Sequence, residues 1–242
     1  MALDQSISLT FDNMNQDIIK SFFRLLDDYL IGDLNTMIYK VLDMPIGGLS
    51  YPSVHTILCG MELLGIVLSK GKKDEHAFGY FWDNYFVKDN SQYNDKRLQK
   101  IFRYTIRNGT AHFFLVKFGI QLTKRNKGNL TKTQNDELNI DIKSFYLDFQ
   151  KTYQRIKNES LNKKNKQLQN SFIEGYRILL NELQATKQDV NQYIQNIPEF
   201  PTLNVNLQSI SSGASGVNYN QKTEIIARKT TTSGTKLQEF IK

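Results

Sequence analysis

The chain has 242 residues, of which 40% are hydrophobic and 12% aromatic, which is enough to bury one sizeable core. Its formal net charge of +7 favours anionic partners such as nucleic acid, although many Lys-rich domains have this balance without such a partner. Cys59 is the only cysteine, which excludes an intramolecular disulfide and suits a reducing compartment.

The first residues and the apolar stretches of the sequence indicate where in the cell the protein is expected. The first residues lack the basic and apolar stretches of a signal peptide. The longest apolar stretch, residues 54–68, is interrupted by His55 and Glu62, and we expect it to fall short of a membrane span. The sequence therefore predicts a cytoplasmic protein with no membrane partner.

The first half of the chain predicts helices. Apolar residues recur at helical spacing, and turn signals at Met44 to Gly48 and at Lys70-Gly71-Lys72 separate the segments. We expect helices over residues 15–30, 33–42 and from about Ser53 to 69. Residues 74–86 are dense in aromatic side chains at helical spacing, which predicts a packing helix, with an aromatic cage for a ligand as the alternative.

The second half continues this pattern with one interruption. A helix is expected from about Asn94 through residue 112, and helical spacing returns from Lys143 to residue 197, where the polar run 157–170 is either a solvated face or a linker. Between them, residues 120–122 and 138–142 alternate in polarity, which predicts a small β-hairpin inserted at about residues 117–142. The fold class is therefore all-α.

The composition shifts after Pro198. Leu203, Val205 and Leu207 alternate with polar residues, and a Ser- and Gly-rich stretch follows. We expect one helical domain over residues 1–197 and a C-terminal tail over residues 198–242. The tail is either a small β appendage or a flexible segment.

One stretch carries the clearest chemical pattern, Arg107-Asn108-Gly109-Thr110-Ala111-His112. On an ideal α-helix, residues five apart are separated by roughly 140° around the axis, so Arg107 and His112 do not share a face, whereas Asn108 and His112 do. Gly109 weakens a helix, and Asn-Gly favours a turn. The pattern alone therefore predicts that Arg107 ends one helix and that His112 begins another as an ordinary polar residue.

These six residues also resemble the active-site motif of the HEPN family of RNA-cleaving domains. In that motif an arginine, usually followed by a polar residue, precedes a histidine by about four to six positions in a helical segment. Arg107, Asn108 and His112 fill those places, and helices are expected on both sides. The resemblance implies a HEPN-like helical bundle that acts as an endoribonuclease, and a toxin or phage-defence role is typical of the family.

The residue types suit RNA cleavage without a metal or another cofactor. The 2′-hydroxyl of RNA can attack the adjacent phosphate, which leaves a 2′,3′-cyclic phosphate and a free 5′-hydroxyl. His112 would transfer the proton, because a histidine titrates near neutral pH. Arg107 would bind the phosphate oxygens with its planar, permanently charged guanidinium. Asn108 would hold the imidazole or the phosphate by hydrogen bonds.

The resemblance also implies partners besides RNA. The family motif usually lies at a cleft between two domains, so we expect a homodimer that pairs two copies, and an antitoxin or other regulatory protein is a further candidate. Relatives that a nucleotidyltransferase silences tend to carry a tyrosine two residues after the histidine. Phe114 stands there and has no hydroxyl to modify, so adenylylation at this position is not expected.

Other candidate residues are less specific. Glu62 lies in an apolar helix, where it is either a supporting partner of the motif or a hydrogen-bonded structural carboxylate. His55 and His76 lack metal-ligand spacing, so no metal site is expected. The basic residues after the first strand would contact RNA phosphates unless they are simply solvated surface: Lys124, Arg125 and Lys127.

Two alternatives to the ribonuclease stay open. The chain could be a HEPN-like domain that binds a nucleotide or a protein partner without cutting RNA. It could also be a structural helical module in which the motif is accidental. RNA cleavage separates the first hypothesis from the other two, and nucleotide binding separates the other two from each other.

Overall fold

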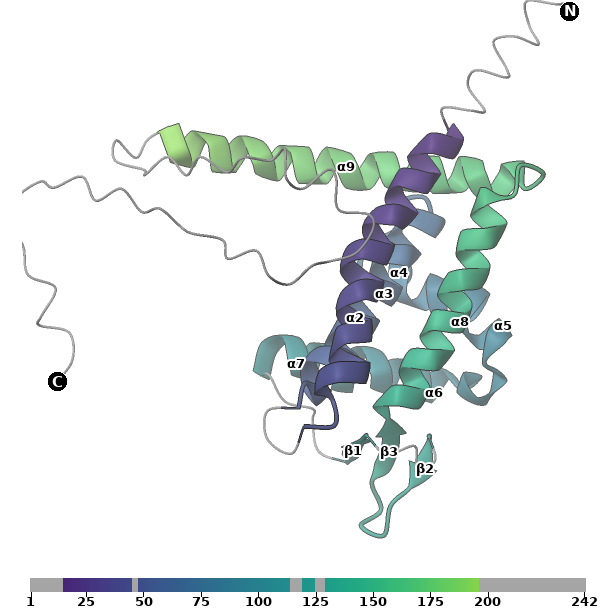
Figure 1. The fold of residues 1–242 in the computed structure, drawn as a ribbon, viewed down its shortest axis with the longest axis vertical. Coiled ribbons are helices and arrows are strands. Elements are labelled where there is room, and N and C mark those ends of the chain that lie inside the picture. Colours follow the sequence, from purple (N-terminus) through teal and green to yellow (C-terminus); the bar gives the residue numbers. More distant parts are fainter. Residues whose placement is uncertain (1–14, 45–47, 114–118, 125–128, 196–242) are drawn as a thin grey trace, which may run out of the picture. The chain divides into compact units, whose positions relative to one another are not determined.

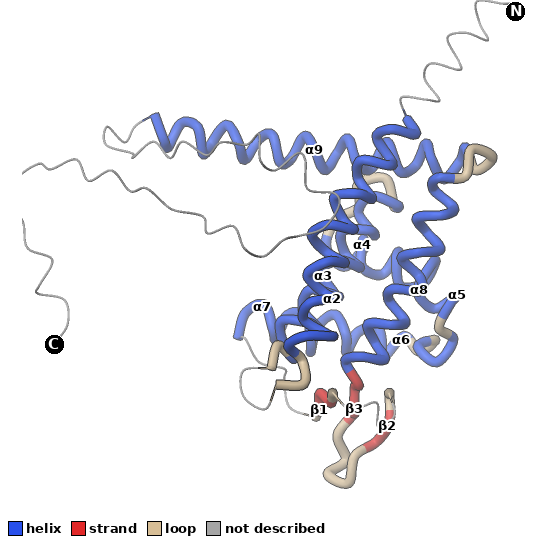
Figure 2. The backbone as a smooth tube through the Cα atoms, viewed as in Figure 1, coloured by secondary structure: helices blue, strands red, loops and turns tan. Residues whose placement is uncertain are grey.

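The structure is a computed structural model that describes residues 15–44, 48–113, 119–124 and 129–195. In these ranges it is mostly helical with one small three-stranded sheet (Figures 1 and 2). The predicted tail at 198–242 lies outside the described residues. The described residues up to Tyr193 belong to one compact unit.

The first two predicted helices form one continuous helical segment. Residues 15–25 are α-helical, and the π-helical η1 (Leu26–Ile31), α2 (Gly32–Thr36) and the π-helical η2 (Met37–Val41) follow without a break. The predicted separation is therefore wrong. Gly32 keeps right-handed helical angles, φ −59° and ψ −48°, and burial of Leu34 and Ile38 outweighs the weak helix propensity of glycine.

Helix α3 (Ser50–Leu68) lies in the core. By length and composition it could cross a membrane, so the expectation that this stretch is too short is wrong. However, 61% of its most apolar window is buried inside the protein, as in the core helix of a soluble protein. It ends at Leu68, just before Lys70 and Gly71, which both adopt positive φ and form the turn that the sequence predicts.

Close helix contacts depend on two glycines. A Cβ atom on Gly65 of α3 would overlap the backbone carbonyl of Ala77 in α4 (Asp74–Phe81). A Cβ atom on Gly175 of α9 (Lys166–Gln195) would overlap the backbone carbonyl of Val67 in α3. Both neighbours of α3 therefore approach it more closely than any larger residue would permit.

The aromatic segment is a packing helix, as predicted. Helix α4 continues into the π-helical η3 (Trp82–Phe86) and α5 (Val87–Asp89), and a short 3₁₀ turn, η4 (Ser91–Tyr93), follows. The rings of Phe78, Phe81, Trp82, Phe86 and Tyr93 are buried, and neighbouring rings are edge to face, tilted or, for Phe81 and Phe86, stacked. These five rings fill the core, whereas Tyr80 and Tyr85 of the same segment line a cavity, so the aromatic-cage alternative stays a prediction for those two residues only.

The predicted hairpin is partly wrong. Strands β1 (Ile120–Thr123) and β3 (Leu138–Asp141) pair in parallel, whereas a hairpin would make them antiparallel. A short strand, β2 (Thr131–Lys132), pairs antiparallel with β3, which gives the strand order β1-β3-β2. The chain between β1 and β3 is long enough to cross over and bring the two strands side by side in parallel. Alternation of polarity is the same in parallel and antiparallel strands, so it could not predict their relative direction.

Two long helices complete the described chain. Helix α8 (Ile142–Leu161) lies beside the first helical segment in Figure 1, and the Tyr153 hydroxyl donates a hydrogen bond to Asp27 at 2.7 Å. A turn over residues 162–165 then leads into α9. The polar run 157–170 is therefore helix at both ends and linker only in its middle.

Candidate functional site

The motif lies on one continuous helical segment. Asp95 caps its start by accepting a hydrogen bond from the Arg97 amide, and α6 (Lys96–Lys100), the π-helical η5 (Ile101–Arg107) and α7 (Asn108–Phe113) follow. Asn108 has φ −71° and ψ −33°, so the turn that the Asn-Gly pair predicts is absent. The helix continues because Gly109 and Thr110 are buried. The backbone of His112 is in α7, and its side chain lies outside what the structure describes.

Glu62 of α3 faces two arginines of this segment. Its Oε2 lies 3.0 Å from Nη2 of Arg107, and its Oε1 lies 3.7 Å from Nη2 of Arg103. The Glu62 and Arg103 side chains are only 11% and 10% exposed, whereas that of Arg107 is 25% exposed. Glu62 is therefore a partner of the motif, and Arg107 is the arginine of the pair that solvent reaches.

Asn108 joins the same cluster. Its Oδ1 accepts a hydrogen bond from Nη1 of Arg103 at 2.7 Å and a longer one from Nη1 of Arg107 at 3.4 Å. Both arginines therefore share a carboxylate and an amide oxygen. We name Glu62, Arg103, Arg107 and Asn108 the arginine cluster.

The arginine cluster is short of negative charge. Two guanidinium groups face one carboxylate, which leaves a formal charge of +1 in a largely buried place. Among the described side chains, Nε of Arg103 and Nε of Arg107 are buried without a hydrogen-bond acceptor. Oε2 of Glu62 is close to Arg107 but is not aligned for a hydrogen bond, so that contact is an ion pair by distance only. Such a cluster has donor capacity left for an anion.

A second set of contacts lies beside the cluster. The Thr110 hydroxyl lies 2.9 Å from the Ile106 carbonyl and 3.0 Å from that of Arg107, and Nδ1 of His55 lies 2.9 Å from the same hydroxyl. Because the hydroxyl has one hydrogen, which it donates to a carbonyl, it accepts from His55. We therefore assign the neutral Nδ1–H tautomer to His55.

The other ring nitrogen of His55 is also engaged. Its Nε2 lies 3.3 Å from Sγ of Cys59 and accepts from the thiol in this tautomer. Burial, followed by the nearby positive charge of Arg107, lowers the pKa of His55, and burial raises the pKa of the Cys59 thiol. Both shifts favour the neutral forms. With both nitrogens occupied, His55 is poorly placed to take a proton from a substrate.

The structure brings together some of the predicted residues. Arg107, Asn108 and Glu62 are in contact, as above, whereas Nζ of Lys124 donates to the Met44 carbonyl at 3.2 Å. Arg125 and Lys127 lie outside the described residues. In the described contacts, Lys124 does not join the arginine cluster.

Sequence reasoning missed Arg103, Thr110 and the role of His55. A signal was present for Arg103, which precedes Arg107 by four residues, and for His55, which precedes Cys59 by four, whereas we find none for Thr110. In a π-helix each carbonyl accepts a hydrogen bond from the amide five residues later, and residues four apart still lie near one face. The π-helical η5 thus aims both arginines at Glu62.

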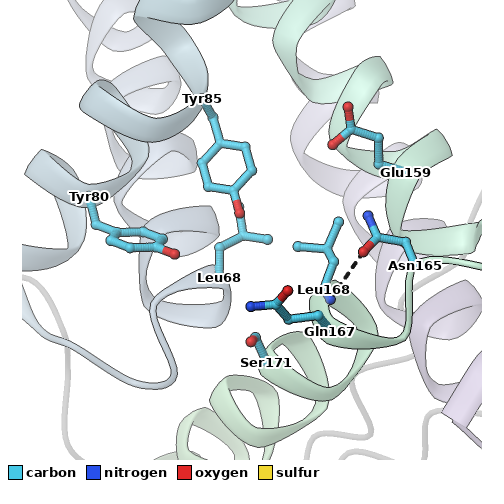
Figure 3. A pocket seen from close by; sticks show the side chains of 8 residues that line it. All are labelled: Leu68, Tyr80, Tyr85, Glu159, Asn165, Gln167, Leu168 and Ser171. Atoms are coloured by element: carbon cyan, nitrogen blue, oxygen red, sulfur yellow. Dashed lines mark hydrogen bonds between the residues drawn. The ribbon is translucent and has the colours of Figure 1, made fainter.

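A separate cavity has different chemistry. It has a volume of about 240 Å³ and lies where α3, α4, η3, α8 and α9 meet (Figure 3). Hydroxyl, amide and apolar side chains dominate its lining, and burial raises the pKa of Tyr85. Its carboxylate, Glu159, is paired with Arg155 at 2.9 Å. Among the described residues that line it, none has a cationic side chain, so this part of the cavity does not match a phosphate.

Comparisons of the chain with protein-family models, with curated proteins and with solved structures find no match.

Proposed function

We propose that this chain is an endoribonuclease of the HEPN type that cleaves RNA without a metal. The observation that supports the proposal is the arginine cluster, in which two guanidiniums share one carboxylate on the helix that carries the motif. A phosphate diester bears one negative charge, which matches the formal charge left over in the cluster.

Arg107 is the group that would contact the scissile phosphate, because its side chain is the more exposed of the two arginines. Glu62 contacts its guanidinium as an ion pair and Asn108 by a long hydrogen bond, and Arg103 holds Asn108. A guanidinium fixed in this way needs little reorganisation when charge builds up on the phosphorane.

His112 would handle the protons in this reaction. The 2′-oxygen loses its proton to the imidazole and bonds to phosphorus, the bond to the 5′-oxygen breaks, and that oxygen takes the proton back from the imidazolium. The products are a 2′,3′-cyclic phosphate and a 5′-hydroxyl. His55 is not a substitute, since Thr110 and Cys59 occupy its two nitrogens.

The wider setting belongs to the same proposal. The enzyme would act in the cytoplasm, as a homodimer, in a toxin or phage-defence role, and an antitoxin or other regulatory protein would control it. The second candidate function is binding of a nucleotide without cleavage. The arginine cluster alone also supports this candidate, because the phosphate of a nucleotide fits its spare positive charge without any proton transfer by His112.

The test is incubation of the full chain with mixed RNA in excess EDTA, followed by analysis of the product ends. We expect cyclic phosphates from the parent protein, and a rate at least about 10²-fold lower from His112→Ala, because the proton-transfer group is lost. Cleavage that stops on chelation and returns with magnesium or manganese contradicts the metal-independent mechanism. Equal rates from both proteins contradict the assignment of His112.

Nucleotide binding separates the remaining hypotheses. If the parent protein cuts no RNA, a titration with a short RNA follows, with Arg107→Ala as the control. Binding that depends on Arg107 would support the non-cleaving module, and an absence of binding would leave a structural helical protein.

A further inference from the structure

The long helix α9 carries a seven-residue repeat. From Ile173 onward, seven positions alternate between spacings of three and four residues, and six of the seven are apolar. An average spacing of 3.5 residues is the pattern of helices that pack along one another as a coiled coil. The seven positions are Ile173, Tyr176, Leu180, Leu183, Lys187, Val190 and Ile194.

The two ends of this stripe differ in burial. Ile173 is 4% exposed, and the ring of Tyr176 contacts that of Phe22 edge to face at 5.1 Å. From Leu180, which is 37% exposed, the described apolar positions are open to solvent: Leu183 is 58% exposed and Val190 is 49% exposed. The same repeat that packs on the protein's own core thus continues as an apolar helix face in solvent.

We infer that this exposed part of the stripe, Leu180 to Ile194, is the surface through which two copies of the chain pair as helices. An apolar face with a spacing of 3.5 residues calls for a helical partner, and a second copy supplies one with the same repeat. The positions that flank the stripe are uncharged by sequence, so like charges there do not oppose self-association: Gln184, Thr186, Asn191 and Tyr193.

The chain's own C-terminal segment is a poorer occupant. Pro198 and Pro201 follow α9 directly, and Leu203, Val205 and Leu207 alternate with a period of two. Neither feature provides a helix with a seven-residue repeat. The segment therefore does not offer the spacing that the stripe requires.

Lys187 sets the direction of the pair. It is the one polar residue in the stripe, and its side chain is exposed. In a parallel pair in register, the two Lys187 ammonium groups would share one layer and repel each other. In an antiparallel pair, Lys187 instead lies opposite an apolar residue of the second copy, Val190 or Leu183 according to the register. We therefore assign the antiparallel arrangement, in which Lys187 costs stability but the two charges stay apart.

The direct test is sedimentation equilibrium on the full chain over a range of concentrations. We expect a reversible dimer of about twice 28.1 kDa. The double variant Leu183→Glu/Val190→Glu should be monomeric, because it places charges in the apolar layers. The matched control, Ala185→Glu/Gln192→Glu, adds the same charge to exposed positions on the opposite face of α9 and should remain dimeric.

A substitution that strengthens the dimer tests the stripe independently of the substitutions that break the dimer. Lys187→Leu should tighten the dimer at least about tenfold, since it removes the charge from an apolar layer. Ala185→Leu adds the same side chain on the opposite face and should leave the affinity unchanged. A parent protein that stays monomeric up to about 100 µM, or a dimer that survives Leu183→Glu/Val190→Glu, would overturn the inference. A monomeric parent would also contradict the homodimer of the proposed function, on which this inference rests, whereas RNA cleavage in EDTA tests the ribonuclease separately.

Discussion

Two arginine-centred networks in this protein differ in their balance of charge. Arg155 of α8 has two carboxylate partners, Asp89 at 2.8 Å and Glu159 at 2.9 Å, and it also donates to the Tyr85 carbonyl at 3.2 Å. Its Nε reaches both oxygens of Asp89. In the arginine cluster, by contrast, two arginines divide one carboxylate and leave both Nε groups without an acceptor.

Arg155 is therefore expected to stabilise the fold, whereas Arg103 and Arg107 keep hydrogen-bond donors that an added anion could use. The Arg155 network is satisfied within the protein, so its expected role is to tie α8 to the segment α4–α5. A buried cluster that leaves donors unpaired costs stability, and such a cost is common where a ligand supplies the missing partner. The two networks thus differ in the number of acceptors that each guanidinium has, and not in whether they contain arginine.

The largest effect on stability is expected in the satisfied network. Arg155→Ala removes the partner of Asp89, whose side chain is 12% exposed, and should lower the free energy of unfolding by about 3 kcal/mol. Thermal melts and urea titrations measure this loss. RNA cleavage measured well below the melting temperature should not change. A variant as stable as the parent would show that the network contributes little.

Much of the fold, but less of the candidate site, could be predicted from the sequence. Helical spacing located α3 and the aromatic helix, because a buried stripe imposes the period directly. It could not show that Gly32 and Asn108-Gly109 stay helical, since burial of their neighbours overrides local propensity. The Arg103–Glu62 contact joins two helices far apart in sequence, and no local pattern encodes which faces meet.

A smaller loss of stability, and one that an added anion should reverse, is expected in the arginine cluster. Glu62→Gln leaves two guanidiniums without a carboxylate and should lower the free energy of unfolding by about 1–2 kcal/mol in chloride buffer. Sulfate or phosphate should restore much of this loss by binding the folded state.

Melting temperatures in sulfate and chloride at equal ionic strength measure that recovery. Glu159→Gln is the matched control, because Arg155 keeps Asp89 and should show no added response to sulfate. The same gain in both variants would mean that the cluster has no special capacity for anions.

The smallest effect is expected from the pH dependence of stability. The pKa of His55 is lowered in the folded protein from 6.5, mainly by burial and then by Arg107, while Glu62 opposes the shift. The unfolded chain therefore binds the proton more readily as pH falls below about 6.5, so stability decreases there and is unaffected well above it. His55→Gln should make the melting temperature depend less on pH in this window. An unchanged slope would show that His55 does not contribute.

The most direct test of the central claim compares the two networks in one assay. Arg107→Ala and Arg155→Ala are incubated with the same RNA in excess EDTA, at a temperature where both remain folded by circular dichroism. The account predicts that Arg107→Ala reduces the cleavage rate at least about 10²-fold, since it removes a contact to the transition state, and that Arg155→Ala cuts at the parental rate. Parental cleavage by Arg107→Ala, or equal losses in both variants, would contradict it.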